Sequence, residues 1–498
     1  MLLVDDVLSC AASAVPGRVA VTLGDASMTF GEMRRRANRL VNALHGWGVT
    51  RGDLVVHWAN ADIDAAPFQF AIGRLGAVFA PLNPASTDAE VRVALNYLRP
   101  RLLVVDGDHA GRGEALAGEC GVPLACGGGR GPGLDLARLS ADASPSSPDA
   151  PWPDEGDAFT IFLTSGTTGQ PKGVVISHRA TWLRTYAGAG PISTTGGGGH
   201  LVTFPLFHMA GWIFAYYAWS AHQPAHLVAK PTGPEILDGV ERHRPVALYC
   251  IPAVWERVLA EPAGHDISSV EWALLGTSLV DPALLAALKE RFPGSRTTIN
   301  YGSTEVCRAL SLADRDLFSK PRSVGVPIPG CRTAVADDGE LLLQSETLMS
   351  GYFEMPDATD EVLVDGWYHT GDLVEQDEEG YFTIVGRKKD MIRSGGEWVA
   401  PLEVEDALHD YPGLSEVAVV GVPADRWGEV VCAFVVMADG AAAPTPEQLR
   451  GHLQARLVSY KHPRRVEVVD SLPRTTATGQ IQRAVFARSV FIAGGGSS

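Results

Sequence analysis

The chain has 498 residues, of which 46% are hydrophobic and 20% are charged, and its formal net charge is −17. A chain of this length normally divides into more than one domain, so we expect at least two. The acidic balance argues against nucleic acid as a partner, because its recognition rests on neutralising phosphates with lysine and arginine. It also argues against an anionic membrane surface, so an anionic ligand must be bound by local positive groups.

The cysteines and the start of the chain indicate the compartment. The seven cysteines are scattered without a CxxC pair, so we expect neither a disulfide framework nor a zinc site. Asp5 and Asp6 stand where a signal peptide would be basic, and no apolar run of about 18 residues occurs. We therefore predict a cytoplasmic protein that does not associate with membranes.

The first part of the chain alternates between helical and strand patterns. Residues 29–49 open with Thr29 and Glu32, which form a capping box, and their apolar residues recur at helical spacing. Short apolar runs at 54–57 and 102–105 are typical of strands, with helical segments between them. Alternation of this kind favours an α/β architecture with parallel sheets.

The middle of the chain continues this pattern after an interruption. Residues 126–156 are rich in Gly, Pro, Ser and Asp, which predicts a surface loop with little regular structure. An apolar strand at 158–163 leads into a loop of glycine, threonine and serine. Helices and short strands alternate again at 231–300, and 339–385 has the pattern of strands joined by turns. We predict a large α/β domain with two parallel-type sheets, helices and a β-rich subdomain.

The pattern changes after Gly386. A segment of about 110 residues follows, which is enough for a small α+β domain. Its predicted elements are a helix at 402–409, strands at 417–422 and 430–437, and a helix at 446–457. The expected organisation is an N-terminal domain at 1–386, a hinge at 387–389, a mobile C-terminal domain at 390–493 and a disordered tail at 494–498.

The strongest local signal is a phosphate-binding pattern that directly follows the strand at 158–163. It reads Thr164-Ser165-Gly166-Thr167-Thr168-Gly169-Gln170-Pro171-Lys172-Gly173. Glycines allow the backbone to approach phosphate oxygens, the hydroxyl groups add donors, and Lys172 adds a positive charge. The spacing is not that of a Walker A loop. An ordinary turn is the alternative, but this string is too particular for one, so we predict a phosphate cradle.

The run 164–174, followed by Ser177 and His178, resembles the signature loop of acyl-CoA synthetases, peptide-synthetase adenylation domains and luciferases. Further motifs of that superfamily follow in the expected order, at 205–211, 300–305, 368–372, 386–390 and 394–397. The resemblance covers essentially the whole chain. On these motifs the chain is identified as a member of the acyl-adenylate-forming superfamily, in its acyl-CoA synthetase branch.

The resemblance implies a nucleotide site for ATP or AMP. Tyr301 is expected to stack on adenine beside Gly302 and Ser303, and Thr304 to donate to the α-phosphate. Glu305 is expected to hold Mg²⁺ if adenylation is retained. The ribose hydroxyls are assigned to Asp372 with the help of Arg387, and the hinge of the small domain to Lys389.

The resemblance also implies an acyl pocket and a coenzyme A site. His208 is expected to gate the pocket by swinging its ring, although a lone histidine there is usually a packed core residue. The other expected pocket residues are Trp212, Tyr217, Gly276, Thr277 and Asn300. No acid occurs at 207–211, where amino-acid-activating relatives carry an aspartate, so a plain and apolar carboxylic acid is the expected substrate. Free coenzyme A is expected to bind at Gly395, Gly396, Glu397 and Trp398.

One departure from the family pattern bears on mechanism. A lysine near the C-terminus of these enzymes bridges the carboxylate and the α-phosphate during adenylation, and its task is electrostatic. Gln480 occupies that position here, in a loop one residue longer than usual. Lys461 is the lysine closest in sequence, and Arg483 is a possible substitute, although a guanidinium at a shifted position would not reproduce the lysine geometry.

We therefore expect poor or no adenylation but competent thioesterification, with the acyl-adenylate supplied by a separate adenylating enzyme. Four alternatives stay open: a complete ATP-dependent synthetase with a substitute cation, an engineered Lys→Gln variant, a non-catalytic nucleotide-binding homologue, and oxidative chemistry on an adenylate as in luciferases. The longer loop argues against an engineered point substitution, and the intact hinge and thiol-side loop argue against a non-catalytic protein.

Overall fold

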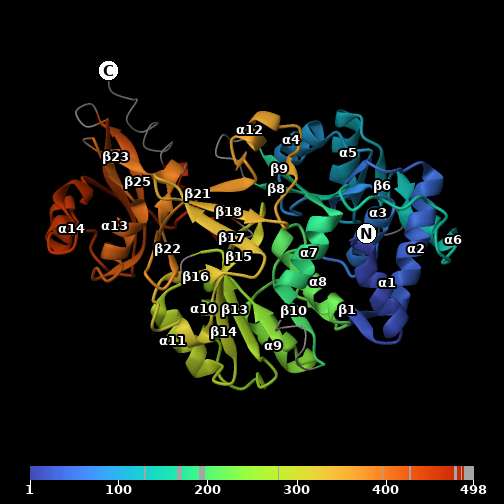
Figure 1. Cartoon of the computed structure of the whole chain (residues 1–498), viewed down its shortest axis with the longest axis horizontal. Helices are drawn as coiled ribbons and strands as arrows, with labels where there is room; N and C mark the ends of the chain where they lie inside the picture. Colours follow the sequence, from blue (N-terminus) through green and yellow to red (C-terminus); the bar gives the residue numbers. More distant parts are fainter. Residues whose placement is uncertain are drawn as a thin grey trace. The chain divides into compact units, whose positions relative to one another are not determined.

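The computed structural model describes residues 1–127, 131–164, 171–189, 197–278, 280–394, 396–424, 428–475, 479–483 and 485–486 (Figure 1). Contacts divide the chain into two compact units. Unit 1 comprises residues 1–321, 327–331 and 344–363, and unit 2 comprises residues 322–326, 332–343 and 364–498. The phosphate-binding segment and the expected acyl pocket belong to unit 1, whereas the expected ribose, thiol and hinge residues belong to unit 2.

The first sheet of unit 1 carries the phosphate-binding segment on one of its strands. Its strand order is β19(Gly351–Tyr352), β9(Lys172–Ser177), β8(Ala158–Thr164), β4(Val78–Pro81), β3(Leu54–Trp58), β5(Leu102–Val105), β6(Leu124–Cys126), β7(Leu134–Asp135). Strands β3 to β8 are parallel, and β9 runs antiparallel to β8 and β19. Helices α3(Ala65–Arg74), α4(Asp88–Leu98) and α5(Ala110–Cys120) alternate with the parallel strands along the chain. Parallel strands in such βα units are buried under helices, which explains why their sequences are continuous apolar runs.

The second sheet of unit 1 carries the expected adenine motif. Its strands run in the order β15(Cys307–Leu312), β14(Arg296–Ser303), β13(Trp272–Gly276), β12(Ala247–Tyr249), β10(His200–Val202), β11(Ala225–Leu227), β1(Val19–Leu23), β2(Ala26–Thr29). The strands from β14 to β1 are parallel, and β15 and β2 are antiparallel to their neighbours. Helices α9(Gly233–His243), α10(Pro252–Ala260) and α11(Pro282–Arg291) alternate with these strands along the chain. The alternating α/β architecture predicted from the sequence is confirmed.

Two helices of unit 1, α7(His178–Ala189) and α8(Met209–Ser220), pack side by side (Figure 1). Helix α8 is buried from Ala210 to Trp219, which explains why its sequence is apolar on every face. At the N-terminal side, α1(Asp5–Ala14) and α2(Phe30–Trp47) also pack together. The predicted capping box of α2 is confirmed, with Thr29 and Glu32 each satisfying the other's backbone amide.

The prediction of an irregular loop at 126–156 is wrong in part. Strand β7 and helix α6(Leu136–Asp142) lie within it. The side chain of Asp135 caps α6 by accepting a hydrogen bond from the Arg138 amide, and Leu136 is buried. Arg39 of α2 donates to the carbonyls of Ala141 and Ala143 at 2.6 and 2.7 Å. These tertiary contacts stabilise a helix that composition alone does not indicate.

Unit 2 begins with antiparallel strands that carry the expected ribose motif. These are β16(Ser323–Pro327), β17(Cys331–Val335), β18(Glu340–Ser345), β21(Trp367–Gln376) and β22(Phe382–Arg387), with β18 paired to β21 and β22 paired to both β21 and β16. The short strand β20(Leu363–Val364) pairs with β21, and the one-turn helix α12(Pro356–Asp360) of unit 1 precedes it in the chain. The domain boundary expected at 386–389 falls inside unit 2 and stays a prediction.

The rest of unit 2 is a small α+β fold. Its sheet contains β24(Glu397–Val399), β23(Ile392–Ser394), β26(Gly428–Met437), β25(Leu414–Ala424) and β27(Arg465–Val468). Helices α13(Pro401–Leu408) and α14(Pro446–Leu453) pack on one face of it through Val404, Leu408, Leu449 and Leu453. The predicted elements after Gly386 are confirmed, except that the helix predicted at 446–457 ends at Leu453. The tail at 494–498 lies outside the described residues. Throughout the described ranges, the helices all lack the combination of length and apolar character that crossing a bilayer requires.

Candidate active site

The predicted phosphate-binding residues lie at the carboxyl end of β8. Thr164 is the last residue of β8, and its hydroxyl donates to the carbonyl of Lys172, the first residue of β9, at 3.3 Å. Ser165, Gly166, Thr167, Thr168 and Gly169 lie outside the described residues. The two ends of the expected cradle are therefore held together by the β8–β9 ladder.

The expected adenine motif lies at the carboxyl end of β14. Tyr301 is half-buried and pairs with Leu310 of β15. Gly302 follows it where the backbone of β15 comes very close, because a Cβ atom at Gly302 would lie 1.6 Å from the carbonyl oxygen of Cys307. The next turn is closed by the hydroxyl of Ser303, which accepts from the amide of Glu305 at 3.2 Å. Only glycine fits at position 302, which agrees with its place in the motif.

Arg184 fixes the backbone of this motif, and sequence reasoning did not identify it. Its side chain, from α7, is almost fully buried. The guanidinium donates to the carbonyls of Thr347, Thr304 and Glu305 at 2.8, 3.1 and 2.9 Å. Burial lowers the pKa of the Arg184 guanidinium, and arginine side chains stay protonated in proteins. A charged donor thus sets the position of Thr304 and Glu305 through their own main chain.

Glu305 and Lys172 both contact Tyr352 of β19, another residue that sequence reasoning missed. The Tyr352 hydroxyl donates to Oε1 of Glu305 at 3.0 Å. The ammonium of Lys172 lies 4.8 Å from the centroid of the Tyr352 ring. The structure therefore brings together the lysine of the phosphate-binding segment and the carboxylate of the adenine motif.

The residue expected to bind Mg²⁺ is a single carboxylate. Among the described residues, no group of three or more His, Cys, Asp or Glu side chains could hold a metal ion. Mg²⁺ at nucleotide sites is usually bound by one or two carboxylates, with substrate phosphates and water supplying the remaining ligands. Glu305, whose Oε1 accepts one hydrogen bond and whose Oε2 has lone pairs to share, fits this mode.

His208 caps α8 at the start of the expected acyl pocket. Its Nδ1 accepts a hydrogen bond from the Ala210 amide at 3.2 Å, and burial lowers the pKa of the ring to about 4. The ring is therefore neutral at physiological pH and its Nε2 carries the proton. Trp212 packs edge-to-face on Phe79 at 5.7 Å, and its buried Nε1 has no hydrogen-bond partner among the described residues.

The other expected acyl residues lie at the carboxyl ends of β13 and β14, where Gly276 pairs with Asn300. A Cβ atom at Gly276 would lie 2.5 Å from the hydroxyl of Tyr249, so this position also requires glycine. Thr277 follows with a φ of 73°, in the left-handed region that is unfavourable for a β-branched residue. Asn300 is held by the hydroxyl of Ser311, which donates to its Oδ1 at 3.0 Å.

Aromatic contacts connect His208 to this group. The ring of Phe204 lies 6.2 Å from His208 and 4.8 Å from Tyr249. Phe214 of α8 lies 5.9 Å from Tyr249 and 6.1 Å from Tyr217. The structure thus brings His208, Tyr217 and Gly276 to one aromatic cluster centred on Tyr249, a residue that sequence reasoning missed, whereas Trp212 packs on Phe79.

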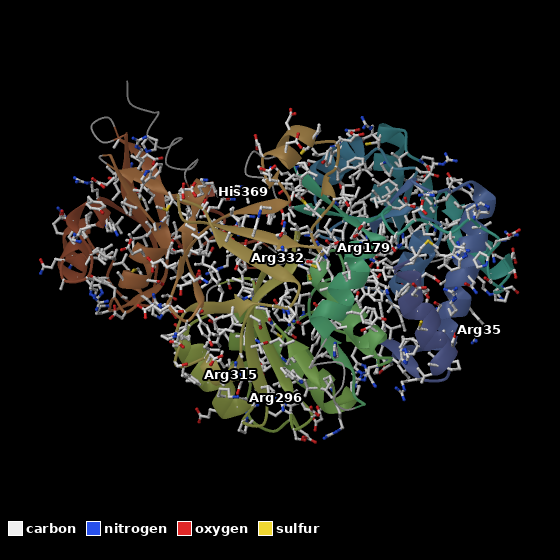
Figure 2. All side chains as sticks on the ribbon, viewed as in Figure 1. Arg35, Arg179, Arg296, Arg315, Arg332 and His369 are labelled. Carbon is white, nitrogen blue, oxygen red and sulfur yellow. The ribbon has the colours of Figure 1, made fainter. Side chains whose placement is uncertain are left out.

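The expected ribose residues are paired within unit 2. Asp372 of β21 is buried and lies opposite Arg387 of β22, and their side chains form an ion pair with an Nε to Oδ1 distance of 2.8 Å. The preceding turn is held by Glu340, which accepts from the Gly371 amide at 2.7 Å and from Lys388 at 3.1 Å. His369, labelled in Figure 2, contacts the same carboxylate at 3.2 Å. Burial would raise the pKa of Glu340, but these three partners together lower it.

The expected hinge and thiol-side residues lie at the start of the small fold. Lys389 is in a short turn, Lys388–Asp390, after β22. Gly395 lies outside the described residues, and Gly396 has a φ of 94°, which favours glycine. Glu397 and Trp398 follow on β24 and are exposed, with the guanidinium of Arg393 lying 5.6 Å from the Trp398 ring.

Gln480 lies on a narrow hairpin in unit 2. Arg474 and Ile481 form an isolated antiparallel bridge, and the amide of Gln482 donates to the carbonyl of Pro473 at 2.8 Å. Gly479 has a φ of 66°, the turn conformation typical of glycine. Gln480 is half-buried. The hairpin thus has a defined backbone on both sides of residues 476–478, which lie outside the described residues.

Three described cations considered as replacements for a lysine at position 480, Lys461, Arg474 and Arg483, are each bound to a carboxylate. Lys461 lies 2.6 Å from both oxygens of Glu403, and Arg483 lies 2.7 and 2.6 Å from the two oxygens of Glu405. Arg474 pairs with Glu416 and also donates to the carbonyl of Gly479. These pairs are formed within unit 2.

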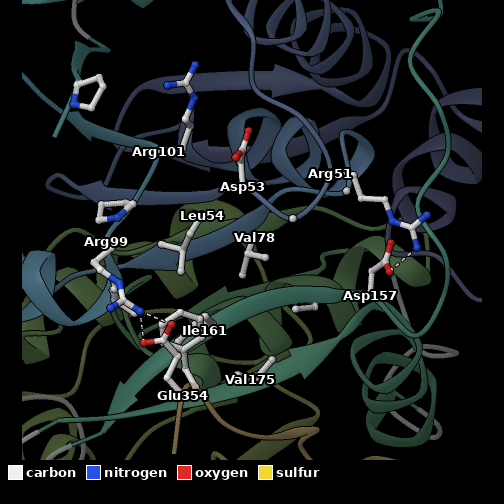
Figure 3. Close-up of a pocket in the computed structure, with 17 residues that line it drawn as sticks. Arg51, Asp53, Leu54, Val78, Arg99, Arg101, Asp157, Ile161, Val175 and Glu354 are labelled. Atoms are coloured by element: carbon white, nitrogen blue, oxygen red, sulfur yellow. Dashed lines mark hydrogen bonds and ion pairs between the residues drawn. The ribbon is translucent and has the colours of Figure 1, made fainter.

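A pocket of about 940 Å³ lies at the amino ends of the parallel strands of the first sheet, away from the phosphate-binding segment at the carboxyl end of β8 (Figure 3). It is lined by the first residues of three parallel strands, Leu54 of β3, Val78 of β4 and Ala158 of β8. Its arginines are largely paired, Arg51 with Asp157 and Arg99 with Glu354 (Figure 3). Ligands of open parallel sheets bind at the carboxyl ends of the strands, so we assign neither nucleotide nor acid to this pocket.

Comparison with known proteins identifies the family. Residues 8–353 match the model of the AMP-binding enzymes, and residues 403–479 match the C-terminal domain of the AMP-binding enzymes. A feruloyl-CoA synthase of Amycolatopsis sp is 34% identical over 94% of both chains, and the indoleacetate–CoA ligase of Aromatoleum aromaticum is 32% identical over 96% of this chain and 97% of its own. The crystal structure of ATP-bound MatB from Rhodopseudomonas palustris superposes with a TM-score of 0.88 at 27% identity, over 97% of this chain and 98% of that one.

The chain belongs to the AMP-binding enzyme family, the acyl-adenylate-forming superfamily. Within it the chain is a member of the acyl-CoA ligases, which are acid–thiol ligases with ATP and AMP as nucleotide ligands. The predicted fold class, a large α/β N-terminal domain and a small C-terminal domain, is confirmed by the same comparisons.

Proposed function

We propose that this ligase converts the adenylate of an apolar, aromatic carboxylic acid to its coenzyme A thioester and is impaired in making that adenylate from ATP. In the proposed reaction the thiol sulfur bonds to the acyl carbon, the bond from that carbon to the AMP oxygen breaks, and AMP leaves with the thiol proton released. The single observation that supports the division of the reaction is the neutral side chain at Gln480.

The electrostatic argument depends on what the family lysine does. Adenylation brings a carboxylate and a polyphosphate together, and a positive charge between them offsets their repulsion. Removing one preorganised donor at such a site costs about 10²–10³ in rate, and removing a full charge should cost at least as much. Gln480 can donate hydrogen bonds, but it supplies no charge.

Arg483 or Lys461 would have to leave an existing ion pair to act as the substitute cation. Arg483 and Glu405 are both mostly buried, so breaking their contact would leave a buried charge without its partner, which typically costs about 3–5 kcal/mol. Lys461 contacts both oxygens of Glu403. These two ion pairs argue against the alternative of a complete synthetase that uses Arg483 or Lys461 as its cation.

The substrate class follows from the aromatic cluster around Tyr249. Phe204, Phe214 and Tyr217 surround it, and residues 207–211 contain no acid that could pair with a substrate ammonium. Flat rings of this kind favour an aromatic substrate by stacking and edge contacts. The names of the feruloyl-CoA synthase and the indoleacetate–CoA ligase point to the same class.

The test separates the two half-reactions. The purified chain is mixed with ferulic or indoleacetic acid, ATP, Mg²⁺ and coenzyme A, and separately with the preformed adenylate of the same acid and coenzyme A. Thioester from the second mixture alone supports the proposal and implies a separate adenylating enzyme. Equal rates in both mixtures would show a complete synthetase, and no product in either would indicate a nucleotide-binding homologue. A product that requires oxygen rather than coenzyme A would indicate luciferase-type chemistry.

A further inference from the structure

Tyr352 contacts two groups of opposite charge that are both expected at the nucleotide site. Tyr352 is 9% exposed. Its hydroxyl lies 3.0 Å from Oε1 of Glu305, and the centroid of its ring lies 4.8 Å from Nζ of Lys172. A hydroxyl that donates to a carboxylate and a ring face that attracts an ammonium are both favourable contacts of one tyrosine.

Among the described residues of unit 1, neither charge forms an ion pair with a side chain of opposite sign. In the parts of unit 1 that the structure describes, no carboxylate lies within 4 Å of Nζ of Lys172, and no cationic side chain lies within 4 Å of the Glu305 carboxylate. Lys172 begins β9 of the first sheet, and Glu305 lies in the turn between β14 and β15 of the second. Two opposite charges that contact one tyrosine would attract each other strongly at low dielectric. A direct ion pair between them would have to be broken before either could bind a ligand.

The backbone around Tyr352 is fixed to both groups. The amide of Phe353 donates to the carbonyl of Gly173, next to Lys172, at 2.7 Å, and the amide of Met349 donates to the carbonyl of Glu305 at 2.7 Å. The Tyr352 amide itself donates to the hydroxyl of Thr359 at 2.9 Å. The segment 349–353 thus places the tyrosine relative to both charges through main-chain hydrogen bonds.

We propose that Tyr352 is a positioning residue that holds Lys172 and Glu305 in place and prevents them from pairing with each other. The ammonium is then ready for a nucleotide phosphate, and the carboxylate is ready for the divalent cation that the phosphates carry. This inference concerns nucleotide binding and is independent of whether Gln480 supports adenylation.

The experiment measures ATP binding by isothermal titration calorimetry, without an acid substrate, in the presence of MgCl₂ or of EDTA. The test variant is Tyr352→Phe, which keeps the ring face for Lys172 and removes the donor to Glu305. Loss of a hydrogen bond to a charged group should raise the Kd in Mg²⁺ by about tenfold. The Kd in EDTA should stay unchanged, because the contact with Lys172 remains.

The matched control is Tyr97→Phe. The Tyr97 hydroxyl donates to the carbonyl of Phe353 at 2.5 Å and accepts from the Gly173 amide at 3.3 Å. It therefore contacts the residues that follow Tyr352 and Lys172 in the chain, but neither of the two charged groups. This control should retain the gain in affinity that Mg²⁺ gives to the wild-type chain. A third variant, Glu305→Gln, should lose that gain, and adding Tyr352→Phe to it should change nothing further.

Several results would overturn the proposal. These are an unchanged Mg²⁺ gain in Tyr352→Phe, an equal loss of affinity in EDTA, the same loss in Tyr97→Phe, or additive effects in the double variant. A wild-type chain whose ATP affinity does not depend on Mg²⁺ would overturn it as well. If Tyr352→Phe does not fold, Mg²⁺ dependence that is kept in Glu305→Gln or lost in Tyr97→Phe would still overturn the proposal.

Discussion

The backbone of Gln480 forms two hydrogen bonds with Thr475, donating one and accepting the other. The Gln480 amide donates to the Thr475 hydroxyl at 3.1 Å, and the Thr475 amide donates to the Gln480 carbonyl at 2.9 Å. Position 480 is therefore held by its main chain and by a neighbouring hydroxyl. A different side chain can be introduced there without removing either of these hydrogen bonds.

Gln480→Lys should create acid-dependent ATP–pyrophosphate exchange. The added charge offsets the repulsion between carboxylate and polyphosphate, and the exchange rate should rise by about 10²–10³ over the wild-type chain. Gln482→Lys, which adds the same charge two residues further along the hairpin, should give no such gain. If Gln480→Lys stays inactive, the extra loop residue keeps position 480 out of register, and the charge argument alone is insufficient.

Arg483→Ala should destabilise unit 2. The substitution leaves Glu405, whose pKa burial raises despite the opposing charge of Arg483, without its cation. The free energy of unfolding measured in urea should fall by about 3 kcal/mol or more. Arg450→Ala removes an exposed pair with Glu447 and should cost about 0–1 kcal/mol. Equal, small effects of both substitutions would show that Arg483 is available for another role.

Arg184→Met should weaken both folding and nucleotide binding. Three carbonyls that Arg184 satisfies would lose their donor, at a cost of at least about 3 kcal/mol in the free energy of unfolding. The Kd for ATP should rise because Thr304 and Glu305 lose their main-chain anchor. The control is Arg179→Met on the same helix, labelled in Figure 2, whose partners are the side chains of Glu155 and Glu346. A normal Kd for ATP in folded Arg184→Met would contradict the anchoring role.

His208 should not titrate in the physiological range. Its pKa falls from an ordinary value near 6.5 to about 4 on burial, so the folded chain keeps the ring neutral while the unfolded chain protonates. The stability that depends on this ring is therefore complete above pH 6.5 and is lost as the pH falls toward 4. Comparison of imidazole NMR titrations of the wild-type chain and His208→Gln should assign a midpoint near 4. A midpoint near 6.5 would show that the ring is exposed to water.

Much of the fold could be predicted because its signals are local. The capping box of Thr29 and Glu32 spans one helical turn, and the helices and strands after Gly386 follow from short apolar periodicities. Helix α6 was missed because its stabilising contacts come from Arg39, about a hundred residues away in the chain. Composition describes a segment's own preferences, whereas tertiary contacts can override them.

The residues of the candidate site also fall into two groups, those with a local sequence signal and those without one. Thr164, Tyr301, Glu305, Asp372 and Gln480 stand in contiguous motifs, so their chemistry is visible in the sequence, including the missing charge at position 480. Residues that position another residue have no comparable motif in the sequence. Tyr352 contacts Glu305 across 47 positions, and Arg184 contacts Thr304 across 120.

The sequence by itself determined the family, the order of the motifs and the neutral side chain at Gln480. Only the tertiary structure decided that Arg483 pairs with Glu405, 78 positions away, and that one tyrosine contacts both Lys172 and Glu305. The physical reason is that conformational preference and charge are properties of individual residues. A hydrogen bond or an ion pair instead requires two groups that the folded chain brings within about 3 Å of each other.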